Sequence, residues 1–175
     1  IYGEMFFAAA ISAAFAVDHP LEAVRIGLTE IPAECTFARA IHWALRVAPR
    51  IREFRQARQA VEERFAGMHR AHAINNACLV VFGLAIGDGD FTRTIGETVA
   101  MGMDNDCTGA TAGSICGAVV GKKGIPRRWY RKFNDTVHSY LVGRPAFAIS
   151  ALLQRFMVQA GRTWQTEVQQ TGGAR

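Results

Sequence analysis

The residues best suited to chemistry in this chain are two carboxylates that stand two positions apart, Asp104 and Asp106. In extended backbone, residues i and i+2 point to the same side, with their Cα atoms about 7 Å apart. The two side chains can therefore converge on one centre while Asn105 points away. Paired carboxylate oxygens suit a hard cation, Mg²⁺ or Mn²⁺, better than they suit Zn²⁺. Cys107 or Thr108 could supply one further donor.

A helix rich in small residues follows this aspartate pair. Glycine recurs every four residues along a glycine stripe formed by Gly109, Gly113, Gly117 and Gly121. Each glycine inside a helix costs about 0.8–1 kcal/mol relative to alanine, and the close approach of a neighbouring helix would offset that cost. The apolar run 110–121 is shorter than the roughly 20 residues that span a bilayer. We therefore predict a buried helix with the aspartate pair held at its N-terminal end.

Two other interpretations of the aspartate pair have to be weighed. An Asp-x-Asp sequence before a helix can serve as an N-cap only, and the spacing alone favours neither a cap nor a metal site. An EF-hand loop would place Asp104, Asp106, Thr108 and Gly109 at its positions 1, 3, 5 and 6, but position 12 requires a bidentate glutamate and falls on Ile115. The EF-hand is therefore excluded.

The sequence around the aspartate pair resembles the C-terminal metal motif of the ADP-ribosylglycohydrolase family. In that motif Asp-x-Asp, followed by Thr or Cys, opens a helix rich in glycine and alanine. The resemblance covers nearly the whole chain, from Ile1 to the helix near Arg162. It rests on the motif together with segments 1–4, 72–77, 87–91 and 124–126 and with Trp129.

This resemblance implies an all-α fold, a compact orthogonal multi-helix bundle. Residues 1–175 would be the C-terminal part of a single domain of this kind. The first half of the family pattern, with its Gly-Asp segment, Thr-Asp-Asp ligand set and Gly-Asn-rich loop, does not occur in this sequence. We therefore expect a missing N-terminal segment of the same protein as a partner, and we expect this chain alone to be inactive.

The function that the resemblance implies is metal-dependent cleavage of the glycosidic bond between ADP-ribose and an acceptor. The ligand would be an ADP-ribosylated substrate or ADP-ribose, and Mg²⁺ or Mn²⁺ would bind as two ions. Asp104 and Asp106 would share these ions with ligands from the missing segment. Cys107 stands where the family often has a threonine ligand, and because a thiol is a poor ligand for Mg²⁺, Thr108 is the alternative. We assign Asn105 to substrate binding and can name no catalytic acid or base.

The alternative function is a metal-binding or structural protein that has the family fold without hydrolysis. Assaying ADP-ribose release with and without the metal would separate the two functions.

Composition and charge limit the classes of protein to which this chain can belong. Half of the residues are hydrophobic and a fifth are charged, as in ordinary globular proteins. The four cysteines lack C-x-x-C spacing, so we expect no zinc site and a reducing, cytoplasmic location. The net charge is +5, but no nucleic-acid motif accompanies the basic runs 46–64 and 122–132, and the first looks like a solvated helix face. We therefore expect neither nucleic-acid binding nor a membrane span.

Apolar spacing predicts helices throughout the chain and no strand. We expect His19 to be a turn residue, Asp90 to cap a helix, and His72, Asn75 and Asn76 to make capping or core hydrogen bonds. Helices are predicted at 3–17, 21–28, 33–47, 71–86, 91–101, along the glycine stripe, at 127–130 and at 146–159. Two more helices are predicted by their ends alone, one ending at 65 and one at 141. Residues 165–175 are expected to be frayed.

Overall fold

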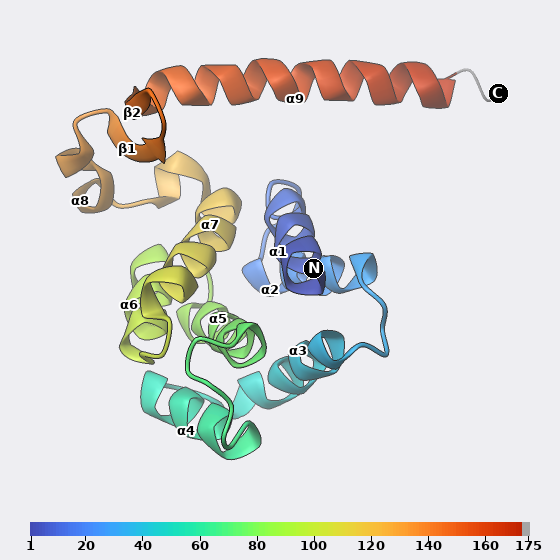
Figure 1. Ribbon diagram of the computed structural model, residues 1–175, viewed down its shortest axis with the longest axis vertical. Helices are drawn as coiled ribbons and strands as arrows, with labels where there is room; N and C mark the ends of the chain where they lie inside the picture. Colours follow the sequence, from blue (N-terminus) through green and yellow to red (C-terminus); the bar gives the residue numbers. More distant parts are fainter. Residues whose placement is uncertain (173–175) are drawn as a thin grey trace. The chain divides into compact units, whose positions relative to one another are not determined.

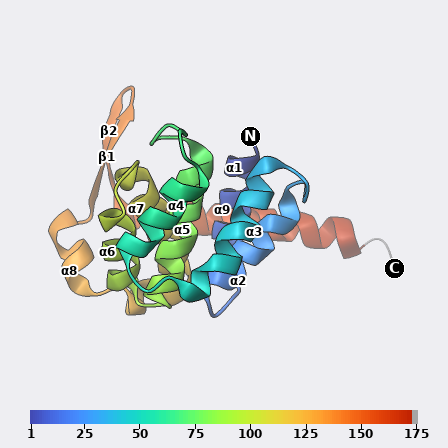
Figure 2. The same cartoon turned by 90° about the horizontal axis from the view of Figure 1, so that it is seen from below.

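One helix with apolar residues on every side forms the centre of the computed structural model. Helix α5 (Ala73–Gly87) buries 12 of its 15 residues, as expected of a helix that is hydrophobic all round. Helices α3 (Thr36–Val47), α6 (Phe91–Ala100) and α7 (Asn105–Gly124) make most of the contacts with it. Figures 1 and 2 show α5 enclosed by these neighbours.

The other helices of this region complete its core. They are α1 (Tyr2–Ala13), α2 (Pro20–Gly27) and α4 (Phe54–Arg64), with short 3₁₀ turns η1 (Leu28–Glu30) and η2 (Ala48–Arg50). Each helix up to α6 begins and ends within four residues of its predicted bounds. Phe6, Phe82 and Ile41 are the largest side chains of the core that are wholly shielded from solvent.

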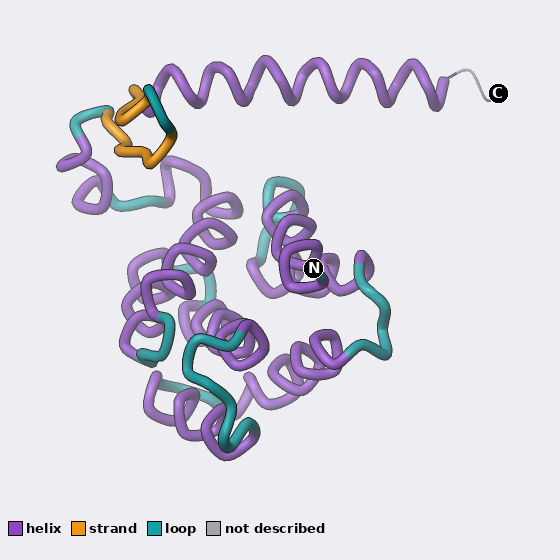
Figure 3. Tube along the Cα trace, viewed as in Figure 1, coloured by secondary structure: helices purple, strands orange, loops and turns teal. Residues whose placement is uncertain are grey.

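The structure describes the backbone of residues 1–172 and the side chains of residues 1–166. It divides into two units, Ile1–Pro126 and Arg127–Arg175. Helices dominate both units (Figure 3), so the predicted all-α class is confirmed, whereas the single domain stays a prediction. Within the described part of the chain, every helix is too short or too polar to cross a membrane.

The second unit corrects the prediction that the chain has no strand. It contains α8 (Arg127–Tyr130), as predicted, and the 3₁₀ turn η3 (Arg131–Phe133). Strands β1 (Thr136–Leu141) and β2 (Arg144–Ala148) then pair antiparallel, where we had predicted a helix up to Leu141. The hairpin forms because β-branched and aromatic residues favour strands and Gly143 turns the chain with φ +73°.

Helix α9 (Ile149–Gly172) follows the hairpin. It begins three residues later than the helix that we predicted from Ala146, because Ala146 belongs to β2. The predicted fraying is wrong for residues 165–172, which are helical, and residues 173–175 lie outside the described residues.

Helices α5 and α6 approach each other at two glycines. A Cβ added at Gly83 would collide with Thr98, and a Cβ added at Gly87 would lie 2.7 Å from the Cα of Thr94. Thr94 and Thr98 are both buried, and the Thr98 hydroxyl donates a hydrogen bond to the Thr94 carbonyl. Only glycine therefore fits at these two positions of α5.

Helices α6 and α7 approach each other along the glycine stripe, as predicted. A Cβ at Gly109 would lie 2.7 Å from Cγ2 of Val99, and a Cβ at Gly117 would lie 3.3 Å from a ring carbon of Phe91. Gly121 differs from the other glycines of the stripe, because its φ of +61° marks a kink inside α7 and no atom lies near it. The stripe therefore serves close packing up to Gly117 and a bend beyond it.

We expect Gly87→Ala to lower the free energy of unfolding by about 1–3 kcal/mol, because the added methyl group overpacks the α5–α6 contact. The matched control is Gly96→Ala on α6, where a Cβ meets no atom within 4 Å. That change should raise stability by up to about 1 kcal/mol through helix propensity alone. Urea denaturation of both variants measures the difference, and equal midpoints would contradict the close contact.

Candidate metal site

The loop that joins α6 to α7, residues 101–104, has an unusual backbone, and we call it the carboxylate loop. Gly102 and Met103 are both left-handed, with φ values of +71° and +63°. For a residue other than glycine this conformation costs about 1–2 kcal/mol. Asp104 follows as the N-cap residue of α7. A backbone held in this conformation needs support from its surroundings.

The aspartate pair converges, although by a geometry different from the predicted one. We had expected extended backbone, but Asp106 lies in the first turn of α7 and only Asp104 precedes the helix. One side-chain ligand atom each from Asp104, Asp106 and Cys107 lies within 4.8 Å of the other two. The first turn of α7 therefore brings the two carboxylates close together, as an extended segment would also have done.

Helix capping does not account for the Asp104 carboxylate. Asp104 occupies the N-cap position, yet its side chain accepts no hydrogen bond from the helix N–H groups. The N-cap side chain does accept one at α2, where His19 receives the Leu21 N–H, and at α6, where Asp90 receives the Arg93 N–H, but not at α4. The carboxylate is therefore left for another partner.

Cys107 is one such partner. Its thiol is hydrogen-bonded to the Asp104 carboxylate, and this bond raises the pKa of Cys107, as do the negative charge of Asp104, desolvation and the more distant charge of Asp106. The thiol therefore stays protonated at neutral pH. A thiol is a soft ligand that suits Mg²⁺ poorly, so Cys107 is a weaker ligand candidate than its position suggests.

Thr108 and Asn105 lie on different sides of the helix start. Thr108 is buried, and its hydroxyl donates a 3.4 Å hydrogen bond to the Asn105 carbonyl. The Asn105 side chain is exposed to solvent. Thr108 therefore faces the interior of the first unit, whereas Asn105 faces outward.

A pocket of about 480 Å³ opens beside the aspartate pair. Asp104, Cys107 and Thr108 form one side of it, and Phe7 and Phe37 form part of an apolar wall. The rest of its lining comes from Ile1, Gly3, Glu4, Ala73, Asn76, Ala77, Val80 and Thr111. Asp104 is therefore the member of the aspartate pair that lines the pocket, whereas Asp106 and Asn105 do not.

Asn76 makes a contact with the carboxylate loop that sequence analysis missed. We predicted capping or core hydrogen bonds for this buried residue, and its amide does donate to the carbonyls of Arg70 and His72. Its Oδ1 also accepts the backbone N–H of Asp104 at 3.2 Å. The predicted role is confirmed, but the link to the aspartate pair joins residues 28 positions apart and leaves no local signal.

Arg58 corrects the prediction of a solvated basic face. Arg50, Arg52, Arg55 and Arg64 are exposed as predicted, whereas Arg58 is half-buried. Its guanidinium donates a 2.7 Å hydrogen bond to the Met101 carbonyl, at the start of the carboxylate loop.

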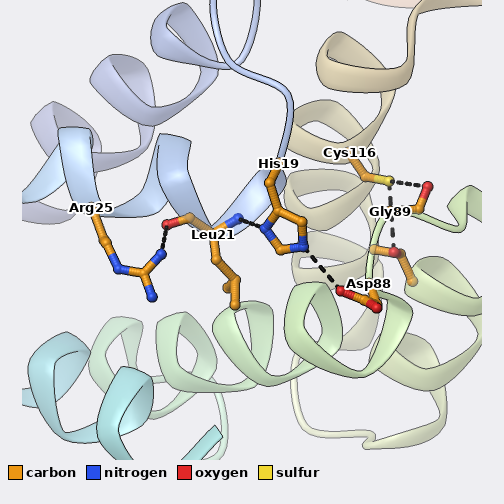
Figure 4. A network of polar contacts seen from close by, with 7 residues as sticks. His19, Leu21, Arg25, Asp88, Gly89 and Cys116 are labelled. Atoms are coloured by element: carbon orange, nitrogen blue, oxygen red, sulfur yellow. Dashed lines mark hydrogen bonds and ion pairs between the residues drawn. The ribbon is translucent and has the colours of Figure 1, made fainter. Parts of the chain in front are cut away.

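Asp88 and Asp90 belong to the turn between α5 and α6, and Asp90 caps α6 as predicted. Asp88 ends α5 in a left-handed conformation, and its carboxylate lies 3.1 Å from Nε2 of His19. Figure 4 shows this contact, together with the Nδ1 atom of His19 that accepts the Leu21 N–H. Nearby in the same view, Cys116 contacts the Gly89 carbonyl. His19 is thus a turn residue, as predicted, and it also caps α2.

The aspartate pair with Cys107 is the one group of three possible metal ligands found among the residues that the structure describes. Its two carboxylates are hard donors that fit Mg²⁺ or Mn²⁺. Three donors fall short of the six that these ions take. The group therefore fits a cation as part of a larger ligand set.

Comparison with known proteins gave one match. A family model described as ADP-ribosylglycohydrolase matches residues 1–162. No curated protein and no solved structure matches the chain. The matched residues include the carboxylate loop, all of α7 and the pocket.

We expect Asp104→Asn to lower the pKa of Cys107 and to speed alkylation of this thiol at pH 8, because the substitution removes a negative charge that favours the protonated form. Alkylation by iodoacetamide, followed by peptide mass spectrometry across pH 7–10, gives the profile. Asp18→Asn, at an exposed turn residue, is the control and should change nothing. Cys78 should react slowly in every variant, since burial raises its pKa to about 12. If the pH profile of Cys107 alkylation is unchanged in Asp104→Asn, the contact between the Asp104 carboxylate and the Cys107 thiol is contradicted.

Proposed function

The chain belongs to the ADP-ribosylglycohydrolase family, and we propose that its aspartate pair holds a divalent cation in the hydrolysis of ADP-ribosyl linkages. Family membership indicates this activity in general terms. The finer assignments, namely the ligands, the metal and the parts played by single residues, rest on the geometry of the carboxylate loop.

The observation that carries the proposal is the position of the Asp104 carboxylate. It stands at a helix N-cap without capping, within 4.8 Å of ligand atoms of Asp106 and Cys107, and at the edge of a pocket. Two carboxylates held this close repel each other. A bound cation would attract both carboxylates, so this arrangement suits a metal site.

We assign Mg²⁺ or Mn²⁺ to the site, as two ions in the complete enzyme. Both ions prefer oxygen ligands over sulfur, so Asp104 and Asp106 supply ligands, and the buried Thr108 hydroxyl is the third candidate ahead of the Cys107 thiol. The remaining ligands would come from an N-terminal segment of the same protein. The chain alone would then bind metal weakly and hydrolyse nothing.

When bound, divalent cations would orient the ribose hydroxyls and lower the pKa of a bound water. The reacting ribose carbon becomes oxocarbenium-like as its glycosidic bond breaks. The chain's own residues would position the substrate. The first N–H groups of α7 suit an anionic group such as a diphosphate, and Phe7 and Phe37 would exclude water from one side of the pocket. Asn105, exposed beside the aspartate pair, would contact the substrate.

The cysteines support a proposal for the cellular setting. Cys35, Cys78, Cys107 and Cys116 are all free thiols, and free thiols are typical of a reducing compartment. We propose the cytoplasm as the location and an ADP-ribosylated molecule or ADP-ribose as the ligand.

In the full-length protein, we expect Asp104→Asn or Asp106→Asn to weaken Mn²⁺ binding by more than about 100-fold, the upper figure for losing an outer-shell partner of a metal site. Release of ADP-ribose from an ADP-ribosylated substrate should fall with it. Calorimetric titration of Mn²⁺ and chromatography of released ADP-ribose are the measurements. Asp18→Asn serves as the matched control.

Three outcomes are informative. Loss of both binding and turnover supports the proposal. Mn²⁺ binding that depends on the aspartate pair without any turnover would favour a non-catalytic metal protein with this fold. Unchanged binding in both variants would contradict the metal site.

A further inference from the structure

We propose that Arg58 and Asn76 are positioning residues that hold the carboxylate loop at its two ends and so set the place of the aspartate pair. The inference rests on the proposed function, because it assigns these residues a part in cation binding. Arg58 comes from α4 and Asn76 from α5, so the loop between α6 and α7 is tied to two further helices.

Arg58 holds the first end of the loop. Its Nη1 donates to the Met101 carbonyl at 2.7 Å, while Nε and Nη2 donate to the Glu62 carboxylate at 2.7 and 2.6 Å. The guanidinium is a planar fork with a fixed arrangement of donors. Because Glu62 holds the side of the fork that carries Nε and Nη2, Nη1 on the other side is directed toward the Met101 carbonyl.

Gly102 allows this approach. A Cβ at Gly102 would lie 2.9 Å from Nη1 of Arg58, and the φ of +71° at Gly102 is disfavoured for other residues. Met103, the next residue, keeps a left-handed conformation with φ +63° although it has a side chain. The contact from Arg58 thus falls at the start of the segment whose backbone most needs support.

Asn76 holds the second end of the loop. Its Nδ2 donates to the carbonyls of Arg70 and His72 at 2.7 and 2.9 Å. These two acceptors fix the orientation of the amide, so the acceptor Oδ1 must face the other way, where it receives the Asp104 N–H at 3.2 Å. Asn76 is 7% exposed, which leaves little competition from water for these bonds.

The two contacts bracket the loop from Met101 to Asp104. A cation site needs its ligands within about 0.5 Å of the productive geometry, and the Asp104 carboxylate is only two bonds from the backbone Cα. Movement of the Asp104 backbone would therefore move the ligand directly. Arg58 does not line the pocket, and its contact with the site is the hydrogen bond to the Met101 carbonyl of the loop.

The test measures Mn²⁺ binding to the full-length protein by calorimetry at 20 °C. We expect Arg58→Ala to weaken binding by about 10- to 100-fold, the range for outer-shell partners of metal sites. Arg58→Lys should recover part of this loss, because an ammonium can still donate to the Met101 carbonyl. The matched control is Arg55→Ala, which removes the same kind of side chain from the exposed face of α4.

A second, milder pair of variants keeps the test valid if Arg58→Ala does not fold. Glu62→Gln weakens the hold on the Arg58 guanidinium and should weaken Mn²⁺ binding in the same direction by a smaller factor. Glu63→Gln changes the neighbouring residue, which accepts a hydrogen bond from Gln59 instead, and should leave binding unchanged.

The outcomes separate this inference from the proposed function. If Arg58→Ala and Glu62→Gln lower the melting temperature but leave Mn²⁺ affinity unchanged, while Asp104→Asn abolishes binding, the positioning role is wrong and the metal site stands. If Asp104→Asn itself leaves Mn²⁺ binding unchanged, the proposed function fails first. Weaker Mn²⁺ binding in the Arg58 and Glu62 variants, with unchanged binding in Arg55→Ala and Glu63→Gln, supports the inference.

Discussion

The structure of the first unit depends on how closely α6 lies between α5 and α7. Gly83 and Gly87 admit the buried Thr94 and Thr98 on one side of α6, and the glycine stripe admits Val99 and Phe91 on the other. Protein interiors are packed as densely as organic crystals, so three helices joined in this way have little freedom to shift. Because α6 ends and α7 begins at the carboxylate loop, this close contact also fixes the two ends between which the loop must pass.

That constraint explains why a strained loop can be kept. Two consecutive left-handed residues, Gly102 and Met103, connect helices that cannot move apart. Glu97 of α6 accepts the backbone N–H of Phe54 and so ties the start of α4 to the same group of helices. Arg58, one turn further along α4, then reaches the Met101 carbonyl. Dense helix contacts thus position a short segment that carries the chemistry.

Much of the fold followed from the sequence, and the failures have physical causes. The spacing of apolar residues placed α1 to α7, and the glycine stripe correctly indicated a close helix neighbour. The hairpin was missed because Thr136–Leu141 is short and its strand preference depends on pairing with Arg144–Ala148. The aspartate pair was found, but its extended geometry was wrong, because α7 begins one residue after Asp104. The contacts of Arg58 and Asn76 with the carboxylate loop could not be predicted from the sequence, because these residues lie 43 and 28 positions from their partners in the loop.

The central claim is that Asp104 and Asp106 together bind a divalent cation. Its most direct test is an anomalous difference map from crystals of the full-length protein grown with Mn²⁺, recorded near the manganese absorption edge. The account predicts a peak within coordination distance of carboxylate oxygens of both Asp104 and Asp106, beside the pocket lined by Phe7 and Phe37. An enzyme whose activity requires Mn²⁺ but whose only anomalous peaks lie away from these two carboxylates would contradict it.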